Sequence, residues 1–242
     1  MTFEELQDLL AEQFSCDTGE LGRGVTLADL GADHEDMVEL AWALGDLSMG
    51  DKLEKLAFNA LPATVKADMT SHQYLQQVNQ VRASDEPRRW YNNANNSNTF
   101  GLEPNFGCCT ANMHQGWPKY AANLWMATRD DGLAALSYAP CTVRFRAGGQ
   151  PVRLRVKTEY PFEDAVRIEV SVKASCRFPI YLRVPAWCNE FKAVCAGETA
   201  SVKDSVAKFE REWHTGDVIE ISLPMTARAT EWFHQSRAVE YG

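Results

Sequence analysis

The spacing of apolar residues changes once along this 242-residue chain, near residue 132. Before that point, apolar side chains recur about every 3.6 residues, which is the repeat of an amphipathic helix. After it, they alternate with polar residues, as in a strand that buries one face. The change predicts a helical part over residues 1–128, a β part over residues 129–242, and the α+β fold class.

Four segments have the helical repeat. They are residues 2–13, 35–44, 51–61 and about 110–126. The second and third flank a break at 45–50, so we expect an antiparallel hairpin, and Pro62 should end its second helix. Residues 85–107 are rich in asparagine and glycine and predict a long loop, which is usually functional or disordered.

Five segments alternate apolar and polar residues, and turn sequences separate them. They are residues 152–160, 165–174, 178–185, 206–213 and 217–224. Short strands at this spacing predict an antiparallel β-sandwich. In 178–185 we expect Phe178, Ile180, Leu182 and Val184 to face inward, with Trp187 closing the core. Tyr181 and Arg183 should face outward.

The composition excludes several classes of protein. With 45% apolar and 24% charged residues, the chain can bury a core. A net charge of −9 argues against a nucleic-acid partner, which requires a basic face. No apolar run is long enough to span a membrane, and the acidic N-terminus lacks the pattern of a secretory signal. Seven irregularly spaced cysteines favour free thiols in a reducing compartment, so we expect a cytoplasmic location.

The charge is concentrated near the N-terminus. Residues 1–54 contain fourteen acidic residues and only two basic ones, Arg23 and Lys52. Such a segment could form an acidic metal or sugar site, or the solvated faces of helices. The sequence leaves both interpretations open.

The adjacent residues Cys108 and Cys109 are the most specific chemical feature. Adjacent cysteines rarely bond to each other, because the backbone strain is severe. They precede a predicted helix, whose terminal amides favour thiolate, the form that binds metals and attacks electrophiles. Metal binding, catalysis, redox chemistry and two buried structural thiols all remain open.

Other polar groups could complete a site. Asp33 and Glu35 lie at the start of a predicted helix, where they could bind a metal or simply cap the helix. Aromatic and amide residues around the cysteine pair suit a carbohydrate, although they could also be ordinary core and surface residues. The candidate sugar-binding residues are His72, Gln76, Gln77, Asn79, His114 and Trp117.

Three segments resemble one family in order along the chain. They are ALGDLSMGDKLEKLAFNALPATVKADMTSHQYLQQVNQV, CCTANMHQGWPKYAANLWMATRDDGLAALSYAP and FPIYLRVPAWC. The sequence resembles glycoside hydrolase family 127, the β-L-arabinofuranosidase-like proteins, from about residue 35 to 242. This resemblance implies the last helices of an (α/α)6 barrel followed by a β-sandwich. It therefore implies a fragment of a larger fold, and the chain looks cut at both ends.

The resemblance also implies a mechanism. In that family zinc is held by a glutamate and three cysteines, one cysteine is the proposed nucleophile, and a separate glutamate is the acid/base. Cys108 matches the nucleophile and Cys109 the other ligand of the pair. Asp33 and Glu35 stand where the family has Glu-x-Cys, so one thiolate is replaced. Asp17 and Glu20 are the candidates for the acid/base, and Cys16 is a further candidate ligand.

Two functions follow from this resemblance. The first is a glycoside hydrolase, or a chain derived from one, that acts on L-arabinofuranosides or related plant-type glycans, and we expect this chain alone to be inactive. The alternative is a truncated, non-catalytic member with a structural or carbohydrate-binding role.

Overall fold

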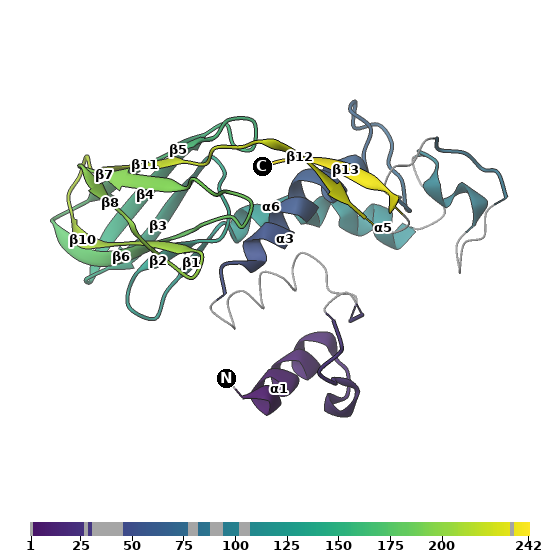
Figure 1. The fold of residues 1–242 in the computed structure, drawn as a ribbon, viewed down its shortest axis with the longest axis horizontal. Helices are drawn as coiled ribbons and strands as arrows, with labels where there is room; N and C mark the ends of the chain where they lie inside the picture. The colour runs from purple at the N-terminus through teal and green to yellow at the C-terminus, as the bar shows by residue number, and fades with distance from the viewer. Residues whose placement is uncertain are drawn as a thin grey trace. The chain divides into compact units, whose positions relative to one another are not determined.

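A computed structural model describes residues 2–26, 29–30, 46–76, 82–87, 94–101, 107–232 and 235–242, without the side chains of residues 13 and 108–110. The chain divides into two compact units, traced from N to C terminus in Figure 1. One unit consists of Met1–Ala43 and Lys52–Ala121, and the other of Leu44–Asp51 and Ala122–Gly242. The second unit thus contains a short segment that precedes most of the first unit in sequence.

The helical elements are short. They are α1 (Phe3–Phe14), η1 (Thr18–Glu20), α3 (Met49–Lys55), η2 (Leu56–Ala60), α4 (Leu61–Ala63), η3 (Asn95–Asn98), α5 (Gly107–Asn112), η4 (Met113–Gln115) and α6 (Gly116–Ala122). By themselves they do not show the (α/α)6 barrel that the resemblance implies. Among the described residues, no helix is both long and apolar enough to cross a membrane.

Local sequence signals explain the ends of α1. Thr2 Oγ1 accepts a hydrogen bond from Glu5 N at 3.1 Å, and Glu5 Oε2 accepts one from Thr2 N at 2.6 Å. This reciprocal pair is a capping box, which satisfies two amides that have no partner within the helix. Ser15 ends α1 in the left-handed conformation, with φ of 50°.

Two prolines modify the helices that the sequence predicted. The predicted helix 51–61 forms α3, η2 and α4, and it ends at Ala63, one residue after Pro62. Its η2 turn is a π-helix, in which Leu61 N donates to Leu56 O. This turn immediately precedes Pro62, which has no amide hydrogen to donate to Phe58.

The single helix expected over 110–126 was wrong in extent. The segment breaks into α5, η4 and α6 and ends at Ala122, and Trp125 already lies in a strand. Pro118 cannot donate to the carbonyl of His114, which explains the 3-10 turn at η4.

The second unit is built of strands. They are β1 (Trp125–Ala127), β2 (Leu133–Ala135), β3 (Cys141–Ala147), β4 (Gln150–Thr158), β5 (Ala165–Val172), β6 (Cys176–Arg183), β7 (Lys192–Cys195), β8 (Glu198–Thr199), β9 (Ser201–Lys203), β10 (Val206–Trp213), β11 (Val218–Ser222), β12 (Ala227–Glu231) and β13 (Arg237–Tyr241). The boundary at 128/129 that the sequence predicts between the helical and β parts lies between β1 and β2. The second compact unit, by contrast, continues from Ala122.

These strands form a β-sandwich and a separate hairpin (Figure 1). One sheet has the order β1-β2-β6-β10-β9, the other has the order β3-β4-β5-β11-β7-β8, and β12 pairs with β13. The pairings are antiparallel except for β2 with β6. Phe145 of one sheet meets Phe178 of the other edge to face, with ring centroids 5.3 Å apart, so the apolar faces of the sheets pack together.

Strand β6 lies inside the five-stranded sheet, and its inward residues Phe178, Ile180 and Leu182 are buried as predicted. Val184 and Trp187 are only half-buried, and Trp213 is the fully buried tryptophan of the core. The expectation that Arg183 faces solvent was wrong, because its side chain is completely buried. The carboxylate of Asp51 and the carbonyl of Leu136 pair with its guanidinium group, and these partners offset the free-energy cost of removing the charge from water.

Candidate functional site

The cysteine pair lies where the sequence placed it, at the start of a helix. The backbone of Cys108 and Cys109 belongs to the first turn of α5, which begins at Gly107. Amides in the first turn have no acceptor within the helix, so they favour a nearby negative charge such as a thiolate. The side chains of both cysteines lie outside the described residues.

His72 lies in a small bridge of extended chain. Its backbone amide and carbonyl both bond to Gly101 at 3.0 Å, and it also pairs with Val65. The His72 side chain is buried. The neighbouring Gln73 donates through Nε2 to the Asn98 carbonyl at 2.6 Å. The bridge therefore fixes the segment of the HQYLQQ motif against residues 97–101.

Gln76 also has a structural partner. Its Nε2 donates to the carbonyl of Ala60 at 3.0 Å. This bond ties the HQYLQQ segment to the end of η2. Gln77 and Asn79, the other predicted sugar-binding amides, lie outside the described residues.

The helices that follow the cysteine pair pack against α4. A Cβ at Gly116 would lie 2.7 Å from Leu61 Cδ1, so a larger residue there would require the Leu61 side chain to move. Thr64 Oγ1 lies 3.4 Å from Met113 Sδ. Residues 60–64 therefore contact both the helical segment that carries the cysteine pair and the segment that carries His72 and Gln76.

Two predicted sugar-binding residues of this segment are accessible. His114 is exposed, and the side chain of Trp117 is 42% exposed. The ring of Trp117 meets buried Tyr120 edge to face at 6.1 Å, and Tyr120 meets Phe58 at 5.7 Å. Trp117 thus has a supported ring with accessible surface, as sugar stacking requires.

The acid/base candidates lie in an exposed turn. Asp17 Oδ1 accepts a hydrogen bond from Gly19 N at 2.7 Å and caps η1. Glu20 is exposed and has no such capping role. Within the described part of the chain, neither residue forms a hydrogen bond or ion pair with residues 46–76 or 107–122. Their predicted approach to the cysteine pair stays a prediction.

The predicted zinc ligands are described only in part. Asp33 and Glu35 lie outside the described residues, as do the side chains of Cys108 and Cys109, so the zinc site is untested. Among side chains that the structure does describe, no group of three histidine, cysteine or acidic residues could hold a metal ion. Cys16 is a half-buried free thiol.

The thiols of the β-sandwich are unsuited to nucleophilic chemistry. Burial raises the pKa of Cys141, Cys176, Cys188 and Cys195. A thiol with a raised pKa remains protonated near neutral pH, and the protonated form is a poor nucleophile and metal ligand. These cysteines are structural.

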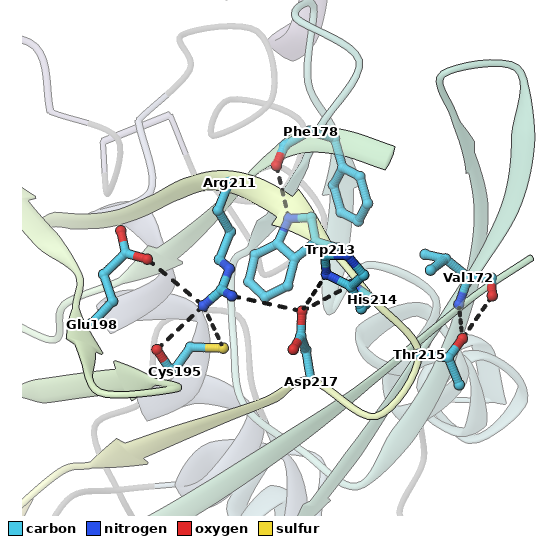
Figure 2. Close-up of polar contacts among 9 residues, drawn as sticks. All are labelled: Val172, Phe178, Cys195, Glu198, Arg211, Trp213, His214, Thr215 and Asp217. Atoms are coloured by element: carbon cyan, nitrogen blue, oxygen red, sulfur yellow. Dashed lines mark hydrogen bonds and ion pairs between the residues drawn. The ribbon is translucent and has the colours of Figure 1, made fainter. Parts of the chain in front are cut away.

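Sequence reasoning missed an arginine network in the sandwich, which Figure 2 shows. Arg211 of β10 lies 3.3 Å from both the carbonyl oxygen and Sγ of Cys195. Its guanidinium also lies 3.7 Å from Glu198 and 3.9 Å from Asp217. Asp217 accepts a hydrogen bond from His214 N at 2.9 Å. The network joins β10 of one sheet to β7 and β8 of the other, so we assign it a structural role.

Sequence reasoning also missed the pair of Asp51 and Arg183. Arg183 Nε donates to the Leu136 carbonyl at 2.6 Å, its NH1 donates to Asp51 Oδ1, and Asp51 Oδ2 accepts from Ala186 N at 3.1 Å. Asp51 belongs to the first segment of the resemblance and Arg183 to the last. Both residues therefore lie in motifs that were identified in the sequence. A motif read along the chain, however, does not show that the two segments meet in the fold.

The comparisons with known proteins agree with the resemblance. Residues 132–225 match the family model described as beta-L-arabinofuranosidase, GH127 middle domain. This match confirms the predicted resemblance to glycoside hydrolase family 127. None of the curated proteins compared with the chain matches it.

Solved structures share the fold. A GH127 beta-L-arabinofuranosidase from Geobacillus stearothermophilus T6 is 19% identical, with a TM-score of 0.71, over 86% of this chain and 34% of that one. A protein described as a glycoside hydrolase is 20% identical, with a TM-score of 0.68, over 86% and 36% of the two chains. A GH127 beta-arabinofuranosidase is 20% identical, with a TM-score of 0.66, over 86% and 34%. The chain spans about a third of the length of these structures.

Proposed function

We propose, on the basis of the GH127 middle domain that residues 132–225 match, that the chain belongs to, or derives from, a glycoside hydrolase acting on L-arabinofuranosides or related plant-type glycans. That match carries the proposal. The start of α5 at the cysteine pair and the accessible ring of Trp117 support it. A reducing, cytoplasmic location is part of the proposal, and the free thiols at Cys16, Cys141, Cys176, Cys188 and Cys195 support it.

Cys108 is the proposed nucleophile. Its thiolate attacks the anomeric carbon, so that a carbon–sulfur bond forms as the glycosidic carbon–oxygen bond breaks. A carboxylic acid gives its proton to the leaving oxygen. The resulting carboxylate then takes a proton from water, the water oxygen displaces sulfur, and the thiolate returns. Two displacements at one carbon retain its configuration.

Glu20 is the better of the two acid/base candidates. The carboxylate of Asp17 already accepts a hydrogen bond from the Gly19 amide and caps η1. The carboxyl group of Glu20 is exposed and caps no helix. We therefore assign proton transfer to Glu20 and a local structural role to Asp17.

Zinc is the proposed cofactor, with Cys108, Cys109, Asp33 and Glu35 as its ligands. Two sulfur and two oxygen donors make the four that a tetrahedral zinc site uses. Bound zinc would favour the thiolate form of its cysteine ligands. With one thiolate replaced by a carboxylate, we expect a lower affinity than a site with three cysteines has.

The proposed sugar contacts come from residues around α6 and the His72 bridge. Trp117 would stack on the sugar ring, and His114, His72, Gln76, Gln77 and Asn79 would bind hydroxyl groups. Since the side chain of His72 is buried in the bridge, its contribution requires a substrate that reaches into this segment.

A non-catalytic, carbohydrate-binding role is the second candidate. It is favoured by the extent of the match, because the chain corresponds to only about a third of each solved structure. A glycosidase pocket needs walls on several sides and a positioned acid/base.

Metal analysis and activity assays on the purified chain distinguish these functions. We expect bound zinc that decreases in Cys109→Ala and is retained in Cys141→Ala, the control in the sandwich. A screen of aryl glycosides then tests turnover, and calorimetry with L-arabinofuranosides tests binding. Turnover abolished by Cys108→Ala supports the hydrolase, and binding without turnover supports the second candidate. A chain with neither zinc nor sugar binding contradicts both.

A further inference from the structure

One outer face of the β-sandwich is strongly basic. On strands β3, β4 and β5 every second residue points to solvent, and the outward positions carry six cations but a single acid, Glu169. We call this surface the basic face. Its cations are Arg144, Arg146, Arg153, Arg155, Lys157 and Arg167.

The strand register brings these like charges together. Arg144 lies directly opposite Arg153, and Lys157 lies directly opposite Arg167. Facing residues of paired strands have Cβ atoms about 5 Å apart, and like charges at that distance are destabilising. Side chains on the same face of one strand follow each other at about 6.7 Å. The basic face is therefore a planar array of closely spaced cations.

Carboxylates neutralise only one side of this array. Glu169 pairs with Lys157 at 2.6 Å and with Arg167 at 3.5 Å, and Glu220 of β11 pairs with Arg167 at 2.9 Å. Within the described residues, the hydrogen bonds on the other side go to neutral acceptors. Arg153 lies 3.4 Å from Ser171 Oγ, and Arg146 donates to the Gly149 carbonyl.

Arg144 lies opposite Arg153, and Arg155 lies opposite Glu169, a carboxylate that already pairs with Lys157 and Arg167. Among the described residues, neither Arg144 nor Arg155 forms an ion pair with a carboxylate, and both are exposed. Four guanidinium groups on β3 and β4 therefore lack a carboxylate partner within the described part of the chain. Each presents a fork of donors that matches the two oxygens of a carboxylate or sulfate.

The other sheet shows that this imbalance is not a general property of the sandwich. On its outer face Arg177 lies opposite Glu212, and Lys208 pairs with Glu210 at 2.8 Å. A surface on which charges of both signs are interspersed keeps a protein soluble, so solubility does not require a cluster of cations. A net charge of −9 makes a cluster of cations more distinctive, since the chain as a whole repels anions.

We propose that the basic face binds an anionic polysaccharide through its uronate carboxylates, whose two oxygens match the donor fork of a guanidinium group. An array of guanidinium groups suits an extended chain with charges at regular intervals. Between its cations the face presents Thr142, Pro151 and Ser171, and the one aromatic residue of these three strands, Phe145, contacts Phe178 of the other sheet, so the face lacks the stacking platforms of single-strand nucleic-acid sites. The choice of a glycan over another polyanion rests on the proposed function.

Calorimetry with the purified chain tests this proposal. The probes are hexagalacturonate for carboxylates, a κ-carrageenan hexasaccharide for sulfates without uronate, a neutral arabinan oligosaccharide and a short DNA duplex. We expect hexagalacturonate to bind, with an affinity that falls as salt rises, because exposed charges are screened. The neutral glycan should not bind at this face.

Matched double variants locate the binding. Arg144→Gln/Arg155→Gln should raise the Kd about tenfold or more, as expected when two exposed charge contacts worth about 0.7 kcal/mol each are lost. Arg177→Gln/Lys203→Gln removes the same charge from the other sheet and should change the Kd less than about twofold. Thermal unfolding confirms that both variants fold, and the conservative Arg144→Lys/Arg155→Lys should restore most of the affinity.

Four results overturn the proposal: no binding of hexagalacturonate, equal losses in both double variants, undiminished binding in Arg144→Gln/Arg155→Gln, or tighter binding of DNA or of the sulfated glycan than of hexagalacturonate. The test is independent of catalysis, since Cys108→Ala should bind the acidic glycan as the unaltered chain does. If the acidic glycan does not bind the basic face, the hydrolase proposal still stands. If the chain shows no turnover, the proposal that the basic face binds an acidic glycan still stands.

Discussion

Asp51 and Arg183 lie 132 residues apart in sequence and form an ion pair in which the arginine side chain is completely buried. Asp51 lies at the start of α3, within the segment 44–51 that belongs to the sandwich unit. Its second oxygen accepts the amide of Ala186, just after β6. The pair therefore joins the segment Leu44–Asp51 to β6, the central strand of the five-stranded sheet.

Removing the carboxylate should destabilise the sandwich unit strongly. Asp51→Ala leaves the guanidinium of Arg183 buried without its counter-charge, and we expect a loss of about 3–5 kcal/mol in the free energy of unfolding. Urea denaturation followed by tryptophan fluorescence measures this, because Trp213 lies in the same unit. The control is Glu231→Ala, which breaks an exposed pair with Arg237 and should cost under about 1 kcal/mol. Equal losses in the two variants would contradict a special role for the buried pair.

Gly50 should tolerate no side chain. A Cβ there would lie 2.4 Å from the Leu136 carbonyl and 2.6 Å from Arg183, so the backbone or the buried arginine would have to move. We expect Gly50→Ala to lower the free energy of unfolding by about 1–3 kcal/mol, the range for overpacked sites. Gly24→Ala is the control, since nothing lies within 4 Å of its Cβ position, and it should leave stability nearly unchanged. A Gly50→Ala variant as stable as Gly24→Ala would contradict the packing described.

Asp130 should make stability depend on acid pH. Partial burial opposes ionisation, but hydrogen bonds from Thr128 and Tyr181 outweigh it and hold the pKa of Asp130 below its ordinary value of 3.8. A carboxyl group whose pKa is lower in the folded state stabilises that state above the unfolded pKa. This stabilisation is lost as pH falls through the folded pKa.

The variants Asp130→Asn and Tyr181→Phe test this dependence. Both should flatten the decline in melting temperature below about pH 4, relative to the unaltered chain, because the favourable ionisation is removed or weakened. Melting temperatures between pH 2.5 and 6 measure the effect. Lys203→Gln, at an exposed position on β9, should leave the slope unchanged.

Cys108 should be the most reactive thiol of the chain at neutral pH. Its place in the first turn of α5 favours thiolate, whereas burial raises the pKa of Cys141, Cys176, Cys188 and Cys195. Limited iodoacetamide labelling at pH 7 and peptide mass spectrometry should show modification of Cys108 at least about tenfold faster than of Cys195. Comparable labelling rates of Cys108 and Cys195 would contradict this prediction and indicate a structural role for the cysteine pair.

The purified 242-residue chain should show little or no turnover of aryl L-arabinofuranosides. The chain corresponds to about a third of the solved structures it matches, and a pocket with few walls neither positions a substrate nor excludes water. Turnover measured with and without added zinc checks this. Robust turnover that Cys108→Ala abolishes would contradict this prediction while supporting the proposed nucleophile.

The sandwich could be predicted from the sequence because strand alternation is a local property. Residues 206–213 and 178–185 alternate strictly, and the structure has strands there at Val206–Trp213 and Cys176–Arg183. Helix ends were less predictable. The apolar residues of 110–126 fit a helical repeat, but Pro118 and a short strand at Trp125 divide that segment.

The candidate site was predictable only as a set of residues. Motifs identified the cysteine pair and the HQYLQQ segment, and the start of α5 agrees with the former. They could not show that Gln73 and Gln76 donate to backbone carbonyls, because those acceptors, Asn98 and Ala60, lie far away in sequence. Whether a polar side chain binds substrate or holds the fold depends on which partners the fold supplies.

The sequence by itself determined five of the strands, β4, β5, β6, β10 and β11, and the motifs that the chain carries, since each depends on neighbours within a few positions. It did not predict the remaining strands, most of which are short. Only the tertiary structure decided that Arg183 is buried and that Arg144 faces Arg153 across two strands. Alternation placed Arg183 on the outer face of its strand, and no local pattern shows that Asp51 reaches it there. Burial of a charge and the clustering of like charges both depend on strand register and chain topology, which set the distances between residues that are remote in sequence.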